Sequence, residues 1–147
     1  MTSKTLYIHY GSSPFNSEYF RKTCRLYYTF DKPCGLWASP VDSNLSWKRF
    51  CKENSYIDHD FDYAFQFYIS DDAKVLHVYS EEDIARYLIG GSASYIPHID
   101  FGTLIKDYDA IEVHLSANNG ELRKSRIFLT WEVDSLVVWN PDVVIPV

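Results

Sequence analysis

The protein has 147 residues, of which 46% are hydrophobic and 17% aromatic, and its formal net charge is −6. This length suits one domain, residues 1–147, with a sizeable core. The acidic balance disfavours nucleic-acid partners, because phosphate contacts need clustered Lys and Arg. It leaves a basic protein surface as the expected macromolecular partner.

The three cysteines, Cys24, Cys34 and Cys51, lack the spacing of zinc ligands, so reduced thiols are expected. The sequence has no signal-peptide pattern and no run of about 18 apolar residues, so membrane insertion is not expected. These features predict a cytoplasmic protein, in a bacterium or in an infected host cell.

Strands are predicted where β-branched and aromatic residues fall between turn residues. In chain order they cover residues 5–10, 36–39, 62–70, 73–80, 109–116 and parts of 126–141, which Pro141 ends. Residues 70–72 suit a hairpin turn between two of these strands, and the polar residues 117–125 suit another. Residues 90–101 are expected to form a loop.

Helices are predicted in three places between the strands. Residues 18–28 suit a short helix that runs into an extended stretch, and residues 45–54 suit a helix capped by Ser43 or Asn44. Residues 80–89 begin with a cap residue and three acids, which favours a further helix. The whole pattern predicts a strand-rich α+β domain.

The first candidate site is the stretch IHYGSSPF. His9 stands at the end of a strand and is followed by Gly11 and Ser12. Glycine at such a turn lets a ligand approach the backbone, and exposed amides there bind a carboxamide or a ribose hydroxyl. The alternative is an ordinary strand-end turn with a partly buried histidine.

The second candidate site is GLWAS followed by SWKRFC. Trp37 on a strand and Trp47 or Phe50 on the next helix are candidates to enclose a flat ring, with Ser39 as a hydrogen-bonding group. Gly35 opens the same strand. The alternative is that all three rings belong to the core.

The third candidate site is WEVDS, near the end of the chain. If this stretch is a strand, Glu132 and Asp134 share one face and Val133 points to the other. A carboxylate there can stabilise a developing positive charge. Glu112 is a further candidate acid, and the alternative is solvated acids on an edge strand.

The other histidines, His59, His77, His98 and His114, are not spaced like metal ligands along the sequence. Structural roles are expected for them, and no metal site is predicted.

In order along the chain, these stretches resemble the His-aromatic-acid branch of the ADP-ribosyltransferase fold. The matching residues are His9 with Gly11-Ser12, residues 35–39, residues 46–51 and residues 131–135. The YDAIEV stretch and the ending SLVVWNPDVVIP are similar to the last strands of small bacterial and phage members. Residues 55–100 fit the pattern less clearly.

Two positions depart from the family pattern. Tyr10 separates His9 from Gly11, where the family has His and Gly adjacent, so Tyr10 is a candidate for the carboxamide contact. The late acid aligns best with Asp134, with Glu132 and Glu112 as alternatives.

The resemblance implies two small antiparallel sheets and a few short helices around a cleft that binds NAD as substrate. His9 would bind a ribose, and the residues that enclose nicotinamide would be Trp37 with Trp47 or Phe50. Ser39 would contact the carboxamide or the ribose, and Asp134 would stabilise the oxocarbenium ion.

The resemblance further implies a mono-ADP-ribosyltransferase that modifies a host protein, as phage or mobile-element effectors, toxins and immunity inhibitors do. Two alternatives remain open. One is an inactive member of the fold that acts by binding. The other is an unrelated α+β interaction module.

Overall fold

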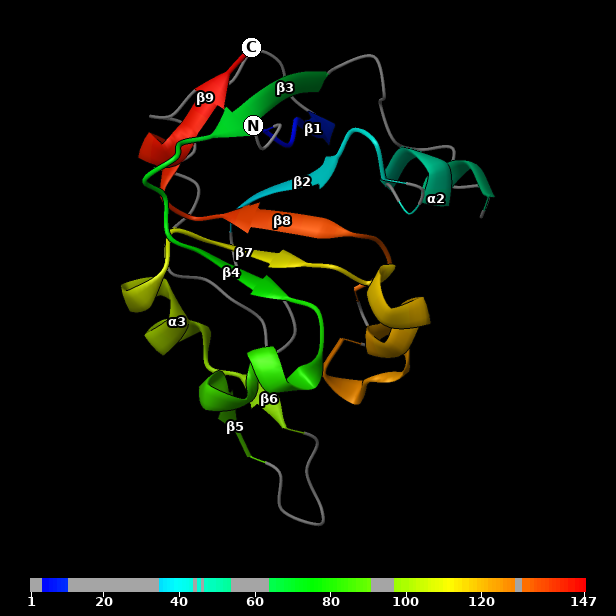
Figure 1. Ribbon diagram of the computed structural model, residues 1–147, viewed down its shortest axis with the longest axis vertical. Coiled ribbons are helices and arrows are strands. Elements are labelled where there is room, and N and C mark those ends of the chain that lie inside the picture. The colour runs from blue at the N-terminus through cyan, green and yellow to red at the C-terminus, as the bar shows by residue number, and fades with distance from the viewer. Residues whose placement is uncertain are drawn as a thin grey trace.

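The computed structural model is a mixed α+β structure built on one curled sheet of seven strands, in the order β4-β7-β8-β2-β1-β3-β9 (Figure 1). The structure describes residues 4–10, 35–43, 45, 47–53, 64–90, 97–128 and 131–147. The strands of the sheet are β1 (Tyr7–Tyr10), β2 (Leu36–Pro40), β3 (Ala64–Ile69), β4 (Val75–Val78), β7 (Ala110–Val113), β8 (Ser135–Val138) and β9 (Val144–Pro146).

The expected strand-rich α+β class is confirmed. The seven strands do not form the two small antiparallel sheets that the resemblance implies. They make one sheet in which β4 and β7 run parallel, and the strands β5 (Leu88–Ile89) and β6 (His98–Ile99) pair separately. The large sheet curls because its strands twist, so β1, β3 and β9 turn over the middle strands (Figure 1).

Alternation along the middle strands divides the core between the two faces of the sheet. On one face, Ile111, Val113 and Val137 pack under helices. On the other face, Leu136 and Val138 join residues of β1, β3 and β9, so the curled sheet encloses a second, smaller core. The side chain of Glu112 belongs to this second face, because Glu112 lies between Ile111 and Val113 on β7.

Short helices surround the sheet. In the part of the chain that the structure describes, the α-helices are α2 (Trp47–Glu53), beside the end of β2, and α3 (Phe101–Asp107), which Asp100 caps through Thr103 (Figure 1). The 3₁₀ helices are η1 (Glu81–Asp83), η2 (Ala85–Tyr87), η3 (Ala117–Lys124), η4 (Arg126–Phe128) and η5 (Pro141–Val143). Among the described residues, no helix is both long and apolar enough to cross a membrane.

Several local predictions are confirmed and others are wrong. Strands β1 and β2 and helix α2 lie where the sequence places them, whereas the predicted helix over residues 18–28 lies outside the described residues. The segment 80–89 forms two 3₁₀ turns and the short strand β5 instead of one helix. Its capping signal is nevertheless present, because the backbone N–H groups of Tyr79 and Ser80 donate to Asp83.

The two predicted hairpins are wrong. Strands β3 and β4 follow one another in sequence but do not pair, because β3 lies between β1 and β9 while β4 pairs with β7. The polar residues 117–125 form η3, where Asn118, Asn119 and Gly120 adopt left-handed backbone angles. The chain then forms η4, the described residues 131–134 are not a strand, and β8 begins at Ser135. β9 follows Pro141 as an additional strand.

Candidate functional site

A pocket of about 250 Å³ opens where β1 and β2 separate. These strands pair at Tyr7 with Pro40 and at Ile8 with Ser39, and their ladder goes no further. Helix α2 and the residues before β8 complete the walls. The described residues that line the pocket are Ile8, His9, Tyr10, Trp37, Ala38, Ser39, Trp47, Val133 and Ser135.

A side-chain hydrogen bond replaces the strand ladder at the mouth of this gap. His9 Nδ1 lies 2.6 Å from the carbonyl oxygen of Trp37. A carbonyl can only accept, so Nδ1 carries the proton and Nε2 is the acceptor nitrogen of the ring. Burial lowers the pKa of His9, and the bond to the Trp37 carbonyl opposes that shift. The ring therefore stays neutral at pH 7 and offers one acceptor toward a ligand hydroxyl.

Indole rings form the walls of the pocket. Trp37 packs on Trp131 with ring centroids 4.8 Å apart, and Trp47 stacks on Phe50 at 5.7 Å. Trp37 and Trp47 are half-buried, so both contact protein on one side and line the pocket on another. The buried Ser39 lines the same pocket, which gives it a polar group beside apolar surface.

The structure therefore brings together five of the residues predicted to bind a cofactor: His9, Tyr10, Trp37, Ser39 and Trp47. Phe50 lies directly behind Trp47. Gly11, Ser12 and Ser46 lie outside the described residues.

Gly35 serves packing at the start of β2. A Cβ atom at this position would lie 2.7 Å from Val137 Cγ1 and 2.8 Å from the carbonyl oxygen of Val138. Real Cβ atoms do not approach so closely, so glycine allows β2 to pair tightly with β8. Gly35 lies outside the described lining of the pocket.

The two late acids do not share a face, because residues 131–134 are not a strand. Glu132 is exposed, whereas Asp134 is only 6% exposed. Asp134 lies between Val133 and Ser135, which both line the pocket, but its own carboxylate points to other partners.

Three hydrogen bonds hold the Asp134 carboxylate. The hydroxyls of Ser43 and Ser116 each donate to Oδ2 at 2.7 Å, and the Ser116 N–H donates to Oδ1 at 2.9 Å. The Asp134 N–H donates to the carbonyl of Leu45. Asp134 thus joins the segment that leads into α2 to the residues that follow β7, and it positions the helix that carries Trp47.

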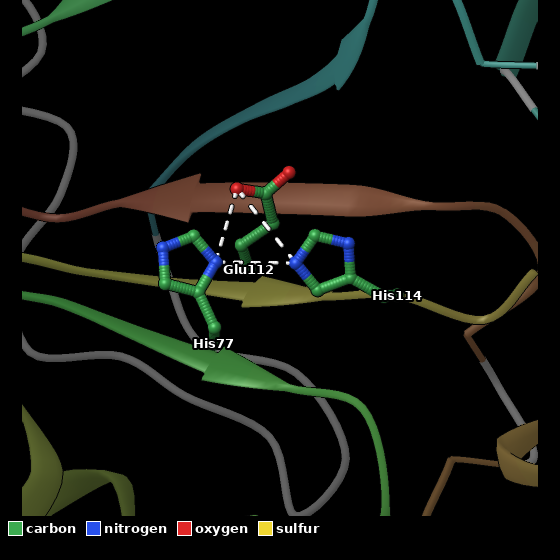
Figure 2. A group of neighbouring side chains, drawn as sticks. All are labelled: His77, Glu112 and His114. Atoms are coloured by element: carbon green, nitrogen blue, oxygen red, sulfur yellow. Dashed lines mark hydrogen bonds and ion pairs between the residues drawn. The ribbon is translucent and has the colours of Figure 1, made fainter. Parts of the chain in front are cut away.

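Glu112, the alternative acid, belongs to a cluster on the other face of the sheet (Figure 2). The parallel register of β4 and β7 places His77 beside Glu112, and His114 follows two residues later. His77 Nδ1 lies 3.1 Å from His114 Nε2 and 3.5 Å from Glu112 Oε1, and His114 Nε2 lies 4.0 Å from that oxygen. The hydroxyl of Tyr7 donates to Glu112 Oε1 at 2.6 Å.

Burial sets the ionisation of the cluster. It raises the pKa of Glu112 and lowers the pKa values of His77 and His114. It also raises the pKa of Tyr7 far above its ordinary range, with the Glu112 charge adding to the effect. The hydroxyl therefore remains a donor and the imidazoles favour their neutral form.

Sequence reasoning misses this cluster, because the spacing of His77 and His114 along the chain indicates structural roles and no metal-like partners. The sequence could have placed Glu112 and His114 on the same face, since residues two apart on a strand share a face. The position of His77 requires knowledge that β4 pairs with β7 in parallel.

The chain matches no family model, and comparison with curated proteins and with solved structures gives no match. We therefore infer the function from the geometry of the pocket and of the groups around it.

Proposed function

We propose that the pocket binds the nicotinamide end of NAD and that the protein is a mono-ADP-ribosyltransferase. The observation that carries the proposal is the gathering of His9, Tyr10, Trp37, Ser39 and Trp47 around one pocket. These residues come from separate parts of the chain, and they are the ones that the ADP-ribosyltransferase pattern would place against NAD.

The pocket suits a flat, polar ring. Indole rings of Trp37 and Trp47 offer faces for stacking, which contributes about 0.5–1.5 kcal/mol beyond the buried area. The Ser39 hydroxyl is a polar group suited to a carboxamide, and His9 Nε2 can accept from a ribose hydroxyl. The Ser135 hydroxyl donates to the Val133 carbonyl, so it can accept from a carboxamide N–H. A volume of about 250 Å³ suits the nicotinamide ring with part of its ribose.

In the proposed reaction the bond between ribose C1′ and the nicotinamide nitrogen breaks. Nicotinamide leaves as a neutral molecule with the bonding electrons, and positive charge develops on the ribose. A nucleophile of the acceptor then bonds to C1′ and releases its proton to solvent. Asp134 is the proposed carboxylate near this charge, because three hydrogen bonds hold it in place between Val133 and Ser135, which both line the pocket.

The acceptor proposed for this reaction is a host protein with a basic surface, because the net charge of −6 disfavours nucleic acid. The biological role that fits is that of a phage-type or mobile-element effector, toxin or immunity inhibitor. It rests on the resemblance of the sequence.

A second candidate function is NAD binding without transfer. It is favoured by the engagement of the Asp134 carboxylate in three hydrogen bonds and by its place outside the described lining of the pocket. A carboxylate used this way holds the fold together and has little capacity left for a ribose hydroxyl.

The test is calorimetric titration of NAD into the full chain, with free nicotinamide followed by chromatography. Trp47→Ala removes one wall of the pocket, and Lys48→Ala is the matched control, because Lys48 is the next residue of α2 and is exposed. We expect saturable binding that Trp47→Ala weakens about tenfold or more, equivalent to about 1.4 kcal/mol, and that Lys48→Ala leaves unchanged.

The two readouts separate the candidates. Binding with release of nicotinamide supports the transferase. Binding without release, with basic host proteins supplied as acceptors, supports the second candidate. An absence of NAD binding, or equal weakening by Trp47→Ala and Lys48→Ala, overturns both.

A further inference from the structure

We propose that His77, Glu112 and His114 form a binding site for a divalent transition-metal ion, with Zn²⁺ as the best fit (Figure 2). This site lies on the other face of the sheet from Trp37 and does not depend on NAD binding. It rests on three side chains held in ligand geometry by the pairing of β4 with β7.

The separations of the three donor atoms match a metal site. The circle through atoms 3.1, 3.5 and 4.0 Å apart has a radius of about 2.1 Å, so a point exists at that distance from His77 Nδ1, His114 Nε2 and Glu112 Oε1 together. Zinc binds imidazole nitrogen at about 2.0–2.1 Å and carboxylate oxygen at about 2.0–2.2 Å. An ion fits at the centre with little movement of the ligands.

The types of donor select the class of metal. Two imidazoles and one carboxylate suit zinc and its neighbours in the first transition row, whereas Mg²⁺ and Ca²⁺ prefer oxygen ligands throughout. Exposure differs among the three side chains, at 46% for His77, 22% for His114 and 4% for Glu112. The ion would therefore be open to solvent on the histidine side, which leaves a coordination position for water.

Charge balance also favours a cation here. Glu112 is buried beside His77 and His114, and the carboxylate of Asp134 also acts on it electrostatically. A buried carboxylate is costly unless positive charge lies beside it, so a cation bound between the three side chains would stabilise the Glu112 carboxylate.

The surroundings hold the three ligands in position. The Tyr7 hydroxyl donates to Glu112 Oε1 and orients the carboxylate, which retains a lone pair for the ion. The ring of Tyr79 stacks on His114 with centroids 4.2 Å apart and planes within 7°, and it also stacks on His77. Such support is what orients ligands in metal sites.

The ordinary alternative is a hydrogen bond between two neutral histidines. It explains the separation of 3.1 Å between their nitrogens. It does not explain why both nitrogens also point toward the same oxygen of Glu112 at 3.5 and 4.0 Å, which is too long for either to be a good hydrogen bond. One ion at the centre accounts for all three separations.

The test uses the full chain after treatment with a chelator and dialysis. Zn²⁺ is titrated by calorimetry, and Co²⁺ by visible absorption, which reports its coordination. His77→Ala removes a ligand at an exposed position, and His98→Ala is the control, because His98 lies on β6 outside the cluster. Mg²⁺ is titrated in parallel as a metal of the wrong class.

We expect one Zn²⁺ per chain, an intense visible band with Co²⁺ and no binding of Mg²⁺. His77→Ala should weaken Zn²⁺ binding at least about 100-fold, since even residues that only orient ligands are worth about 10–100-fold. His98→Ala should change nothing, and Tyr7→Phe should weaken binding about tenfold. Equal affinity in wild type and His77→Ala, or no stoichiometric binding in wild type, would overturn the proposal.

Discussion

The pocket and the His77, Glu112 and His114 cluster lie on one sheet but are assembled in different ways. The pocket takes its residues from short stretches next to the ends of β1 and β2 and from α2, where the chain carries recognisable groupings. The cluster takes two residues from β7 and its end, and one from β4, which pairs with it in parallel. The two places meet at β1, where Tyr7 faces the cluster and Ile8 faces the pocket.

This difference shows what a short stretch of sequence reveals about a site. A tryptophan and a serine two residues apart already suggest a pocket wall, because both groups are neighbours along the chain. A lone histidine in VLHVY suggests nothing, because its partners lie 35 and 37 residues later. The cluster becomes visible only when the register of two strands is known.

The largest loss of stability is expected on substitution of Asp134, which joins the segment before α2 to the residues after β7. Asp134→Ala removes the acceptor of three hydrogen bonds and leaves the Ser116 N–H without its partner. Urea denaturation should show a loss of about 3 kcal/mol in the free energy of unfolding. The exposed Glu132→Ala, two residues away, should stay within about 0.5 kcal/mol of wild type, and equal effects would contradict this role of Asp134.

A smaller loss of stability is expected at Gly35. The added Cβ of Gly35→Ala would collide with Val137 and Val138 and should cost about 1–3 kcal/mol, measured by thermal or urea unfolding. Because Gly35 acts by packing, NAD affinity measured on the folded variant should remain at the wild-type value. A stable Gly35→Ala variant with reduced NAD affinity would place Gly35 at the ligand instead.

Two single substitutions should separate the pocket from the cluster, because each should weaken the binding of one ligand only. Trp47→Ala should weaken NAD binding about tenfold and leave Zn²⁺ affinity unchanged, because Trp47 lines the pocket and is not part of the cluster. His77→Ala should weaken Zn²⁺ binding and leave NAD affinity unchanged, because His77 contacts Glu112 and His114 on the other face of the sheet. Calorimetry with each ligand measures both effects, and loss of both ligands in either variant would show that the sites are not independent.

The smallest expected effect is the contribution of His9 to the pH dependence of stability. Burial lowers the pKa of His9 below its ordinary value of 6.5, so the unfolded chain takes up this proton at a higher pH than the folded chain. Stability should therefore fall as the pH decreases below about 6.5. His9→Gln keeps a donor for the Trp37 carbonyl and should remove this part of the dependence, whereas identical pH profiles of wild type and His9→Gln would refute it.

Local predictions succeed where local chemistry decides the structure. β1, β2 and α2 carry strong local signals and are found as expected. The segment 80–89 shows the limit, since its cap residues act as predicted while Ile84 and Tyr87 are drawn into the core three residues apart and the segment forms 3₁₀ turns. Helix α3 is missed because Asp100, its cap residue, lies in a stretch whose composition is typical of a loop.

Long-range pairing could not be predicted from the sequence. Strands β3 and β4 are joined by turn residues, yet each pairs with strands that come from distant parts of the chain. The same limit applies to Asp134, whose residue type is a visible signal but whose partners, Ser43 and Ser116, are brought to it only by the fold.

The most direct test of the central claim is saturation-transfer NMR of NAD with the full chain. We expect the nicotinamide ring protons to receive the strongest saturation, because the proposed binding mode places this ring beside Trp37 and Trp47, which line the pocket. We also expect Trp47→Ala to reduce this transfer and Lys48→Ala to leave it unchanged. Saturation confined to the adenine protons, or none at all, would contradict nicotinamide binding in this pocket and leave Trp37 and Trp47 with packing roles.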